Sequence, residues 1–167
     1  MTATIENAFG SHLWAKGFLL NNELTDFSFV PIDATDAAVA NAVEGRKRPR
    51  SSMAPTIVLG VDGSPEIVTG SPGGSQIILY VVKTLVAMLD WGLDAQQAAA
   101  LTNFGSQGGP FLIEYSLPIV WPAYELTSYG QAITGATMTS GVNTVARRNG
   151  NLEGGADPRR EGVALGD

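Results

Sequence analysis

The chain has 167 residues, of which 44% are hydrophobic and 16% charged, with 20 glycines and 9 prolines. This composition is typical of a compact, turn-rich α/β or α+β domain and excludes a coiled coil or a disordered tail. A net charge of −6 argues against a general nucleic-acid binder; no cysteine is present for disulfides or thiolate chemistry, and the single histidine excludes a histidine-based zinc site.

The first third of the chain predicts short strands joined by loops. Thr2–Ile5 alternates threonine with apolar residues, and Gly17–Leu20 has the pattern of a second strand. Asp33–Gly45 is rich in small residues with no clear period, which indicates a surface loop. Met1–Gly10 contains no basic region followed by an apolar run, as a targeting segment would.

The middle of the chain predicts a β-hairpin followed by a helix. Thr56–Leu59 and Glu66–Thr69 flank a turn at Asp62–Pro65 and form its two strands. Apolar residues then recur at helical spacing on nearly every face of Ile77–Leu89, which predicts a buried helix. Lys83 interrupts this segment, and it is too short to cross a bilayer, so no membrane span is expected.

The last third alternates between predicted helices and strands. The expected elements are a helix at Ala95–Thr102 capped by Asp94, a strand at Phe111–Tyr115, a helix at Leu117–Tyr129, and a closing pair of strands at Gln131–Met138 and Val142–Arg148. No repeat or linker divides the chain. Residues 1–167 therefore predict a single domain of the α+β class.

A glycine-rich loop at Gly70–Ser75 lies between a predicted strand and a predicted helix. Unpaired N–H groups at a helix start favour anions, so the N–H groups of Gly73 and Gly74 could bind a phosphate, a carboxylate or a developing oxyanion. Ser75-Gln76 stands where a phosphate-binding P-loop would have its Lys and Ser or Thr. The alternative is a turn whose glycines let the helix pack closely on its strand.

Two polar pairs are further candidates for ligand binding. The carboxylates of Glu23 and Asp26 could bind an ammonium group, or they could belong to a solvated turn in an acidic protein. The hydroxyls of Ser51 and Ser52, with nearby backbone N–H groups, could bind a carboxylate, or they could form a polar turn before a strand.

The remaining charged motifs predict structural roles. The basic residues Arg46, Lys47, Arg48 and Arg50 are few and interrupted by Pro49, which is typical of a solvated loop. His12 has no identifiable serine or cysteine partner, and the segment Asp157–Arg160 predicts a turn held by an Arg–Asp pair. No metal site is expected.

The order of these motifs resembles a known family. The blocks GFLLNNELTDFS, KRPRSSMAPT and GSPGGS, and the closing GGADPRR, are similar to successive signatures of the γ-glutamyltranspeptidases, in stretches that begin at Gly17, Lys47, Gly70 and Gly154. The resemblance runs from about Thr2 to Gly162. Glu6 stands where the best-known members have Asn, and Leu101–Tyr115 is only loosely similar.

The resemblance implies a fold and a chemistry. The family belongs to the N-terminal-nucleophile hydrolases, which fold as a four-layer αββα sandwich, and this chain would supply one sheet and its helix layer. A precursor cleaves itself, and the new N-terminal threonine of the small subunit attacks a γ-glutamyl amide such as that of glutathione. The glutamyl group then passes to water, an amino acid or a peptide. No cofactor is expected.

The resemblance also implies roles for particular residues. Carried over by position, Glu23 and Asp26 would bind the α-ammonium of the substrate, and Ser51 and Ser52 would bind its α-carboxylate. The N–H groups of Gly73 and Gly74 would form the oxyanion hole, and Thr4 would support the nucleophile. The family's nucleophile lies one strand and a turn upstream of the block matching Thr2–Gly10. We therefore expect a small-subunit portion that lacks the nucleophile.

Several expectations follow from that placement. The 167 residues alone should be inactive, should need the large subunit of the same precursor, and should expose an apolar sheet face that favours self-association. The full-length parent is expected to be periplasmic or secreted. The alternatives are a non-catalytic γ-glutamyl or amino-acid binding module, perhaps a natural remnant of the enzyme, and an anion or nucleotide binder built on Gly73 and Gly74.

Overall fold

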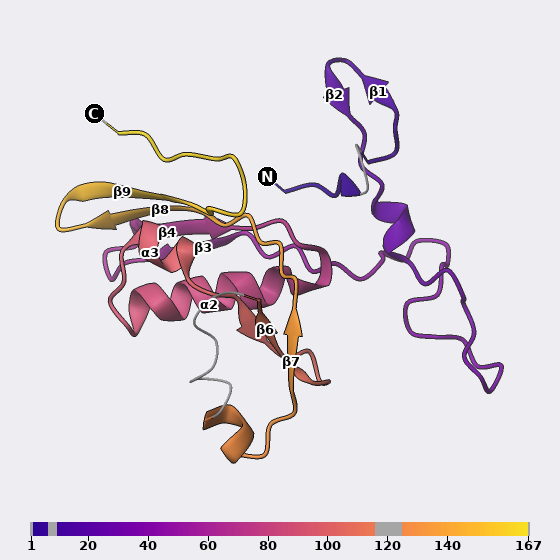
Figure 1. Ribbon diagram of the computed structural model, residues 1–167. Helices are drawn as coiled ribbons and strands as arrows, with labels where there is room; N and C mark the ends of the chain where they lie inside the picture. The colour runs from indigo at the N-terminus through magenta and orange to yellow at the C-terminus, as the bar shows by residue number, and fades with distance from the viewer. Residues whose placement is uncertain (1, 7–9, 116–124, 167) are drawn as a thin grey trace. The chain divides into compact units, whose positions relative to one another are not determined.

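The computed structural model describes residues 2–6, 10–115 and 125–166 (Figure 1). The chain divides into two compact units, Met1–Met53 and Ala54–Asp167, and each is described here by itself. Among the described residues, no helix has the length and apolar character that a membrane span requires.

The described part of the Met1–Met53 unit consists mainly of loops, with a small hairpin and a short 3-10 helix. Strands β1 (Trp14–Ala15) and β2 (Phe18–Leu19) form a hairpin. Its two turn residues, Lys16 and Gly17, both have positive φ, as tight hairpin turns of this kind require. The short 3-10 helix η1 (Glu23–Asp26) follows. The strand predicted at 17–20 is thus confirmed in its central residues.

The prediction of a strand at Thr2–Ile5 is wrong, because this segment has no regular secondary structure. A strand needs a neighbouring strand to bind its N–H and C=O groups. Here the Thr4 carbonyl accepts a hydrogen bond from the Asn22 N–H at the start of η1 instead. The segment is therefore held to a turn rather than to a sheet.

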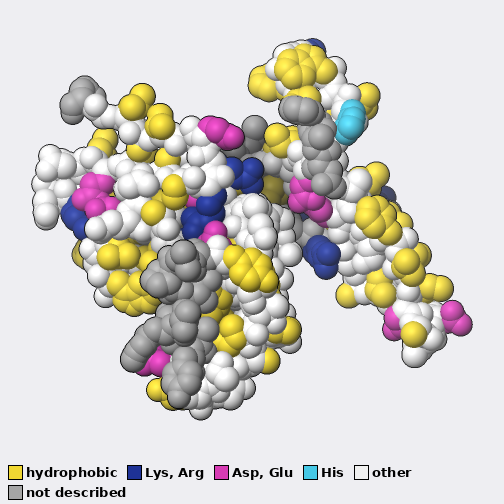
Figure 2. All heavy atoms as spheres, in the orientation of Figure 1, with side chains coloured by type: hydrophobic (Ala, Val, Ile, Leu, Met, Phe, Trp, Pro, Cys, Tyr) yellow, Lys and Arg dark blue, Asp and Glu magenta, His cyan; other side chains and the backbone are white. Residues whose placement is uncertain are grey.

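Many apolar side chains of this unit are exposed. Trp14 and Phe18 of the hairpin are 67% and 72% exposed, and Phe29, on the loop after η1, is 87% exposed. Figure 2 shows hydrophobic side chains gathered around the β1–β2 hairpin. Among the residues that the structure describes, neither of the two core clusters includes a residue of Met1–Met53. Hydrogen bonds join the loops of this unit, and Phe27 is buried within it.

The described part of the Ala54–Asp167 unit forms two sheets and several helical segments. Its elements, in chain order, are β3 (Thr56–Leu59), β4 (Pro65–Gly70), η2 (Gly74–Gln76), α2 (Ile77–Leu89), α3 (Ala95–Ala100), β5 (Phe104–Gly105), β6 (Phe111–Glu114), β7 (Ile133–Ala136), β8 (Asn143–Arg148) and β9 (Asn151–Ala156). The larger sheet is antiparallel with the order β3-β4-β8-β9, and the smaller has the order β5-β6-β7. Helices α2 and α3 cover one face of the larger sheet (Figure 1).

Both helices form where the sequence predicts them. Helix α2 has the predicted bounds Ile77–Leu89, and α3 begins after Asp94, whose side chain accepts the Gln97 N–H while the Gln97 side chain accepts the Asp94 N–H. This capping box satisfies N–H groups that a helix start otherwise leaves unpaired. Helix α2 is not buried on every face, since Ile78 and Val82 are about half exposed.

The larger sheet buries one face and exposes the other. Ile67, Thr69, Thr144 and Ala146 point to the buried face, as the alternation of a strand dictates. On the opposite face Ile57, Val68 and Val145 are aligned directly across β3, β4 and β8, and all three are exposed. We call these three residues the open apolar row. A sheet with helices on one side only is half of the αββα arrangement.

The predicted pairing of the last two strands is wrong. Strand β7 lies parallel to β6 in the smaller sheet, whereas β8 pairs with β4 and with β9, which the sequence did not predict. The β8–β9 hairpin turns at Asn149 and Gly150, both with positive φ. Most of the helix predicted at Leu117–Tyr129 lies outside the described residues, and 125–128 are helical.

A buried polar cluster lies beneath α2 and joins the end of the chain to the core. Its members are Lys83, Asn103, Glu114, Ser140, Asp157 and Arg159. The Arg159 guanidinium binds the carboxylates of both Glu114 and Asp157, so the predicted Arg–Asp turn is confirmed. Charges taken from water need this pairing, because an unpaired buried charge is strongly unfavourable.

Candidate functional site

The two predicted ammonium-binding carboxylates lie on η1. In a 3-10 helix residues three apart are eclipsed, so Glu23 and Asp26 share one face of this short helix. Asn21 accepts the Glu23 N–H through its Oδ1 at 3.0 Å, which holds the start of the turn. Two carboxylates on one face form an acceptor-only surface suited to an ammonium group.

The electrostatics of Asp26 match that assignment. Partial desolvation raises the pKa of the Asp26 carboxyl, the nearby Glu23 carboxylate raises it further, and the Arg50 guanidinium opposes both effects. Like charges held close together each favour protonation of the other. A bound cation would relieve this repulsion, so the turn is electrostatically suited to a cation.

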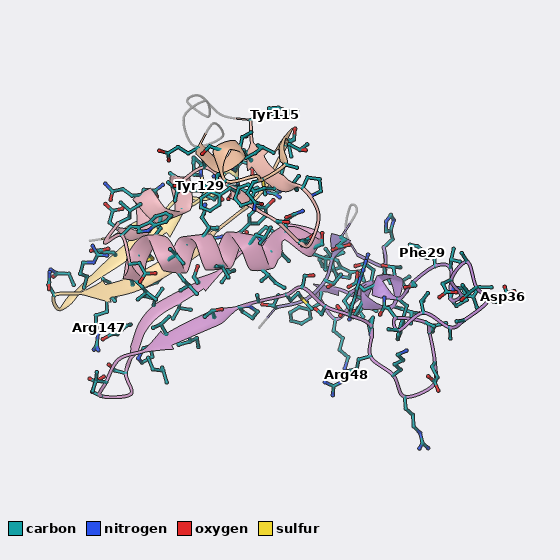
Figure 3. The ribbon with its side chains drawn as sticks, turned by 90° about the horizontal axis from the view of Figure 1, so that it is seen from below. Phe29, Asp36, Arg48, Tyr115, Tyr129 and Arg147 are labelled. Atoms are coloured by element: carbon teal, nitrogen blue, oxygen red, sulfur yellow. The ribbon has the colours of Figure 1, made fainter. Side chains whose placement is uncertain are left out.

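The serine pair is tied to the same turn by Asn41. The Asn41 Nδ2 donates to the Asp26 carbonyl at 2.7 Å, and its Oδ1 accepts the Arg50 N–H at 2.9 Å. Arg50 immediately precedes Ser51 and Ser52. One side chain therefore connects the end of η1 with the start of the serine segment. By contrast, Arg48 is exposed and projects away from η1 (Figure 3).

Thr4 lies against the other end of the serine segment. Its hydroxyl donates to the Met53 Sδ at 3.6 Å, and its carbonyl accepts the Asn22 N–H. The Ser51 Oγ accepts the Met53 N–H at 3.3 Å and so fixes the local turn. Thr4 is itself buried. The Met1–Met53 unit thus brings together Thr4, the acidic turn and the serine pair.

The glycine pair belongs to the other unit, at the start of the helical segment formed by η2 and α2. Gly73 has φ +137° and Gly74 has φ +57°, conformations that favour glycine. A Cβ on Gly73 would lie 2.4 Å from the buried Tyr80 ring. Among the hydrogen bonds of the described residues, none uses the Gly73 or Gly74 N–H as donor. Both N–H groups are available for an anion at this helix start.

A loop near the end of the smaller sheet supports the glycine pair. The Gly141 N–H donates to the Ser71 Oγ at 3.1 Å, and a Cβ on Gly141 would lie 2.7 Å from the Pro72 ring. On either side of Gly141, the Ser140 hydroxyl and the Val142 N–H donate to the Asp157 carboxylate. The glycine loop is therefore connected to the buried polar cluster.

Sequence reasoning missed the residues that support these groups. Asn41 and Gly141 act through contacts with segments distant in sequence, and neither falls in a recognisable spacing. Lys83 was recognised only as an interruption of an apolar helix, although its Nζ donates to the Leu101 carbonyl and to the Asn103 Oδ1. Within 2–6, 10–115 and 125–166, no group of three metal-binding side chains lies together.

Comparison with known proteins shows the family of the chain. The sequence model of the family described as Gamma-glutamyltranspeptidase matches residues 1–167. The glutathione hydrolase proenzyme of Escherichia coli strain K12 is 36% identical over 167 residues, covering 95% of this chain and 29% of that protein. The corresponding proenzyme of Bacillus subtilis strain 168 is 33% identical over 99% of this chain and 28% of its own length.

Solved structures give the same result. A Helicobacter pylori γ-glutamyltranspeptidase mutant (T380A) superposes with a TM-score of 0.79 at 33% identity, covering 96% of this chain and 92% of that chain. An acivicin-inhibited γ-glutamyltranspeptidase superposes with a TM-score of 0.78 at 34% identity and the same coverage. The fold is therefore that of the N-terminal-nucleophile hydrolases, in the incomplete form expected from the sequence.

The chain belongs to the γ-glutamyltranspeptidase family. The resemblance based on the three signature blocks and the closing motif is thus confirmed. The chain spans less than a third of the length of the curated relatives it matches.

Proposed function

We propose that this chain forms the donor-binding part of an enzyme that cleaves γ-glutamyl amides and transfers the glutamyl group to water, an amino acid or a peptide. The observation that carries the proposal is the link made by Asn41 between the acidic turn and the serine pair. A γ-glutamyl donor carries an ammonium and a carboxylate on one carbon. To bind it, the site must therefore hold groups that bind a cation next to groups that bind an anion.

Each predicted residue has a chemical role in this proposal. Glu23 and Asp26 bind the α-ammonium, while Ser51 and Ser52 donate hydrogen bonds to the α-carboxylate. The nucleophilic threonine hydroxyl, supplied by a segment upstream of the matched block, attacks the γ-carbonyl carbon as its proton passes to the threonine amine. Thr4 supports that nucleophile as a positioning residue.

The remaining steps use the glycine pair. The carbonyl oxygen becomes an oxyanion, which accepts hydrogen bonds from the N–H groups of Gly73 and Gly74. As the carbon–nitrogen bond breaks, the leaving amine takes the proton from the threonine amine, leaving a γ-glutamyl ester. Water or an acceptor amine then attacks this ester, and its proton returns to the threonine oxygen.

The proposal requires partners outside this chain. The large subunit of the same precursor and the threonine-led segment would complete the enzyme, and the open apolar row offers a surface that a second sheet could cover. The relatives are named as proenzymes, which fits a small subunit released from a precursor. Without these partners the chain is expected to be inactive and prone to self-association.

A direct assay tests the proposal. The chain assembled with the threonine-led segment and the large subunit should hydrolyse a chromogenic γ-glutamyl anilide, and the 167 residues alone should not. Turnover by the isolated chain would contradict the assignment of the nucleophile to another segment. No turnover by the assembled protein would contradict the proposed activity itself.

A second candidate function is a non-catalytic module that binds γ-glutamyl compounds or amino acids. The observation that favours it is that Glu23, Asp26, Ser51 and Ser52 all lie within the Met1–Met53 unit. Calorimetric titration of the isolated chain with glutamate and with glutathione separates the two. Micromolar binding without the large subunit supports the module, whereas no detectable binding supports the enzyme portion.

A further inference from the structure

A γ-glutamyl donor makes a strict demand on its binding site. Its α-ammonium and α-carboxylate are attached to the same carbon, so the groups that bind them must keep a fixed separation. Misplacement by about 1 Å can cost roughly a hundredfold in rate. On the proposed function, the acidic turn and the serine pair must therefore be fixed relative to each other.

Asn41 is built to provide that constraint. Its amide uses both ends, since Nδ2 donates to the Asp26 carbonyl at 2.7 Å and Oδ1 accepts the Arg50 N–H at 2.9 Å. Its own carbonyl accepts the Ser28 N–H at 3.0 Å. Asn41 thus holds the residues on both sides of Phe27 as well as the residue that precedes Ser51.

Neither core cluster of the described residues provides this constraint. Both core clusters belong to residues of Ala54–Asp167, and the loops around Asn41 carry exposed apolar side chains such as Val30 and Val43. Asp26 and Arg50 are far apart in sequence, so chain connectivity does not fix their separation either. Where no core cluster holds a loop, individual side-chain-to-backbone bonds contribute to its geometry.

We propose that Asn41 is a positioning residue that sets the separation between the carboxylate pair and the serine pair, and thereby determines the preference for donors that carry both α-groups. The amide carries, on two separate atoms, the donor that the Asp26 carbonyl needs and the acceptor that the Arg50 N–H needs. An aspartate of equal size loses the donor and adds a negative charge near Glu23 and Asp26. A leucine of similar shape loses both bonds.

The test compares three chromogenic anilides with the assembled enzyme. The γ-glutamyl anilide carries both α-groups, the glutaryl anilide lacks the ammonium, and the 4-aminobutyryl anilide lacks the carboxylate. For Asn41→Leu and Asn41→Asp we expect KM for the γ-glutamyl anilide to rise about tenfold, as the loss of one or two hydrogen bonds implies, with a smaller change in kcat. The kcat/KM preference for it over the other two should fall by a similar factor.

A matched control separates positioning from general damage. Asn151→Leu, at the exposed start of β9, should leave both KM and the preference unchanged. Equal losses on all three anilides in the Asn41 variants would indicate a merely structural role and overturn the inference. An unchanged preference would overturn it as well.

The two levels of the proposal fail in different ways. If the wild-type enzyme does not act on the γ-glutamyl anilide, the proposed function falls and this inference with it. If the wild type is active and the Asn41 variants keep its preference, only the inference falls.

A second measurement tests the inference on the wild-type chain, in case the Asn41 variants do not assemble. In the full wild-type chain, hydrogen exchange should be slower at the Arg50 N–H than at the Arg46 N–H in the same exposed loop, by about tenfold or more. Equal exchange rates at the two amides would show that the Asn41 bond does not hold in solution, and the inference would be overturned without any variant.

Discussion

The two units hold their candidate ligand groups by different means. In Ala54–Asp167 the glycine loop is connected to a core of strands, helices and a buried ionic cluster, through Ser71 and Gly141. In Met1–Met53 the acidic turn is held by the Asn21 Oδ1, which accepts the Glu23 N–H, and is linked to the segment before the serine pair by the two side-chain hydrogen bonds of Asn41. The difference teaches that the glycine pair proposed as an oxyanion hole is built into a packed fold, whereas the acid and serine pairs proposed to bind the donor are positioned by loop geometry.

The comparison makes opposite predictions for variants in the two units. Substitutions of residues that hold the glycine loop in place should lower the folding stability or the rate of the chemical step. Substitutions in the loops of Met1–Met53 should change donor affinity and preference while stability changes little. The following experiments test this distinction, from the largest expected effect to the smallest.

The largest effect is expected from breaking the buried ion pairs. Arg159→Met leaves the carboxylates of Glu114 and Asp157 without their cation, and we expect the free energy of unfolding to fall by about 3–5 kcal/mol. Urea denaturation measures this change. The control is Arg147→Met, because the exposed Arg147–Asp62 pair at 3.9 Å should contribute less than about 1 kcal/mol. Equal losses in the two variants would contradict the role of the buried cluster.

The next effect concerns the chemical step. Gly73→Ala places a methyl group against the Tyr80 ring at a positive φ, so the N–H groups should move, and kcat of the assembled enzyme should fall roughly 100- to 1,000-fold. Steady-state kinetics on the γ-glutamyl anilide measures this. Gly45→Ala is the control, since that glycine has open space around it and is not among the positive-φ residues. A Gly73→Ala enzyme with wild-type kcat would rule out the proposed oxyanion hole.

A third prediction uses the pH dependence of stability. Desolvation lowers the pKa of the Lys83 ammonium to about 8, with a further lowering by Arg159 that Asp157 and Glu114 oppose. Between this value and the usual 10.5 the unfolded chain binds a proton that the folded chain does not. Unfolding then takes up a proton, so raising the pH disfavours it.

The free energy of unfolding should therefore rise with pH above about 8, by about 1 kcal/mol per pH unit. The window closes near pH 10, where Tyr80, whose pKa burial raises, begins to oppose the trend. Urea denaturation at pH 8, 9 and 9.5 measures the slope. Lys83→Met should remove most of it, and a wild-type slope of zero or below would contradict the burial of an uncharged amine.

The smallest change in folding stability is expected from a substitution in the open apolar row. Val145→Lys puts a charge among the exposed side chains of Ile57 and Val68, so self-association of the chain should decrease while stability changes by less than about 0.5 kcal/mol. Sedimentation velocity measures the association. Thr134→Lys, at an exposed position of β7, is the control. A wild-type chain that is monomeric at high concentration would contradict the prediction.

The local elements of the fold could be predicted from the sequence because their signals are local. Helix α2 follows from a continuous apolar period, the β3–β4 hairpin from a turn between two short apolar runs, and the start of α3 from Asp94 as its cap. The strand partners could not be predicted in the same way. Strands β7 and β8 follow each other in the chain but belong to different sheets, and pairing depends on distant residues.

The candidate site shows the same limit. The acid pair, the serine pair and the glycine pair were recognised as blocks, and their proposed roles remain predictions. Asn41 could not be found, because its partners Asp26 and Arg50 lie in separate loops. The conflict between a side chain on Gly73 and the Tyr80 ring could not be foreseen either, since it depends on how η2 leads into α2.

The open apolar row has a thermodynamic consequence. Any species that covers it binds the folded sheet and not the unfolded chain, so it adds to folding free energy by mass action. The melting temperature of this chain is therefore not a fixed property: it should increase with protein concentration, or with the amount of a covering partner. A partner synthesised on the same polypeptide would act at a high effective concentration. Once that partner dissociated, the stability of the sheet would again depend on the protein concentration.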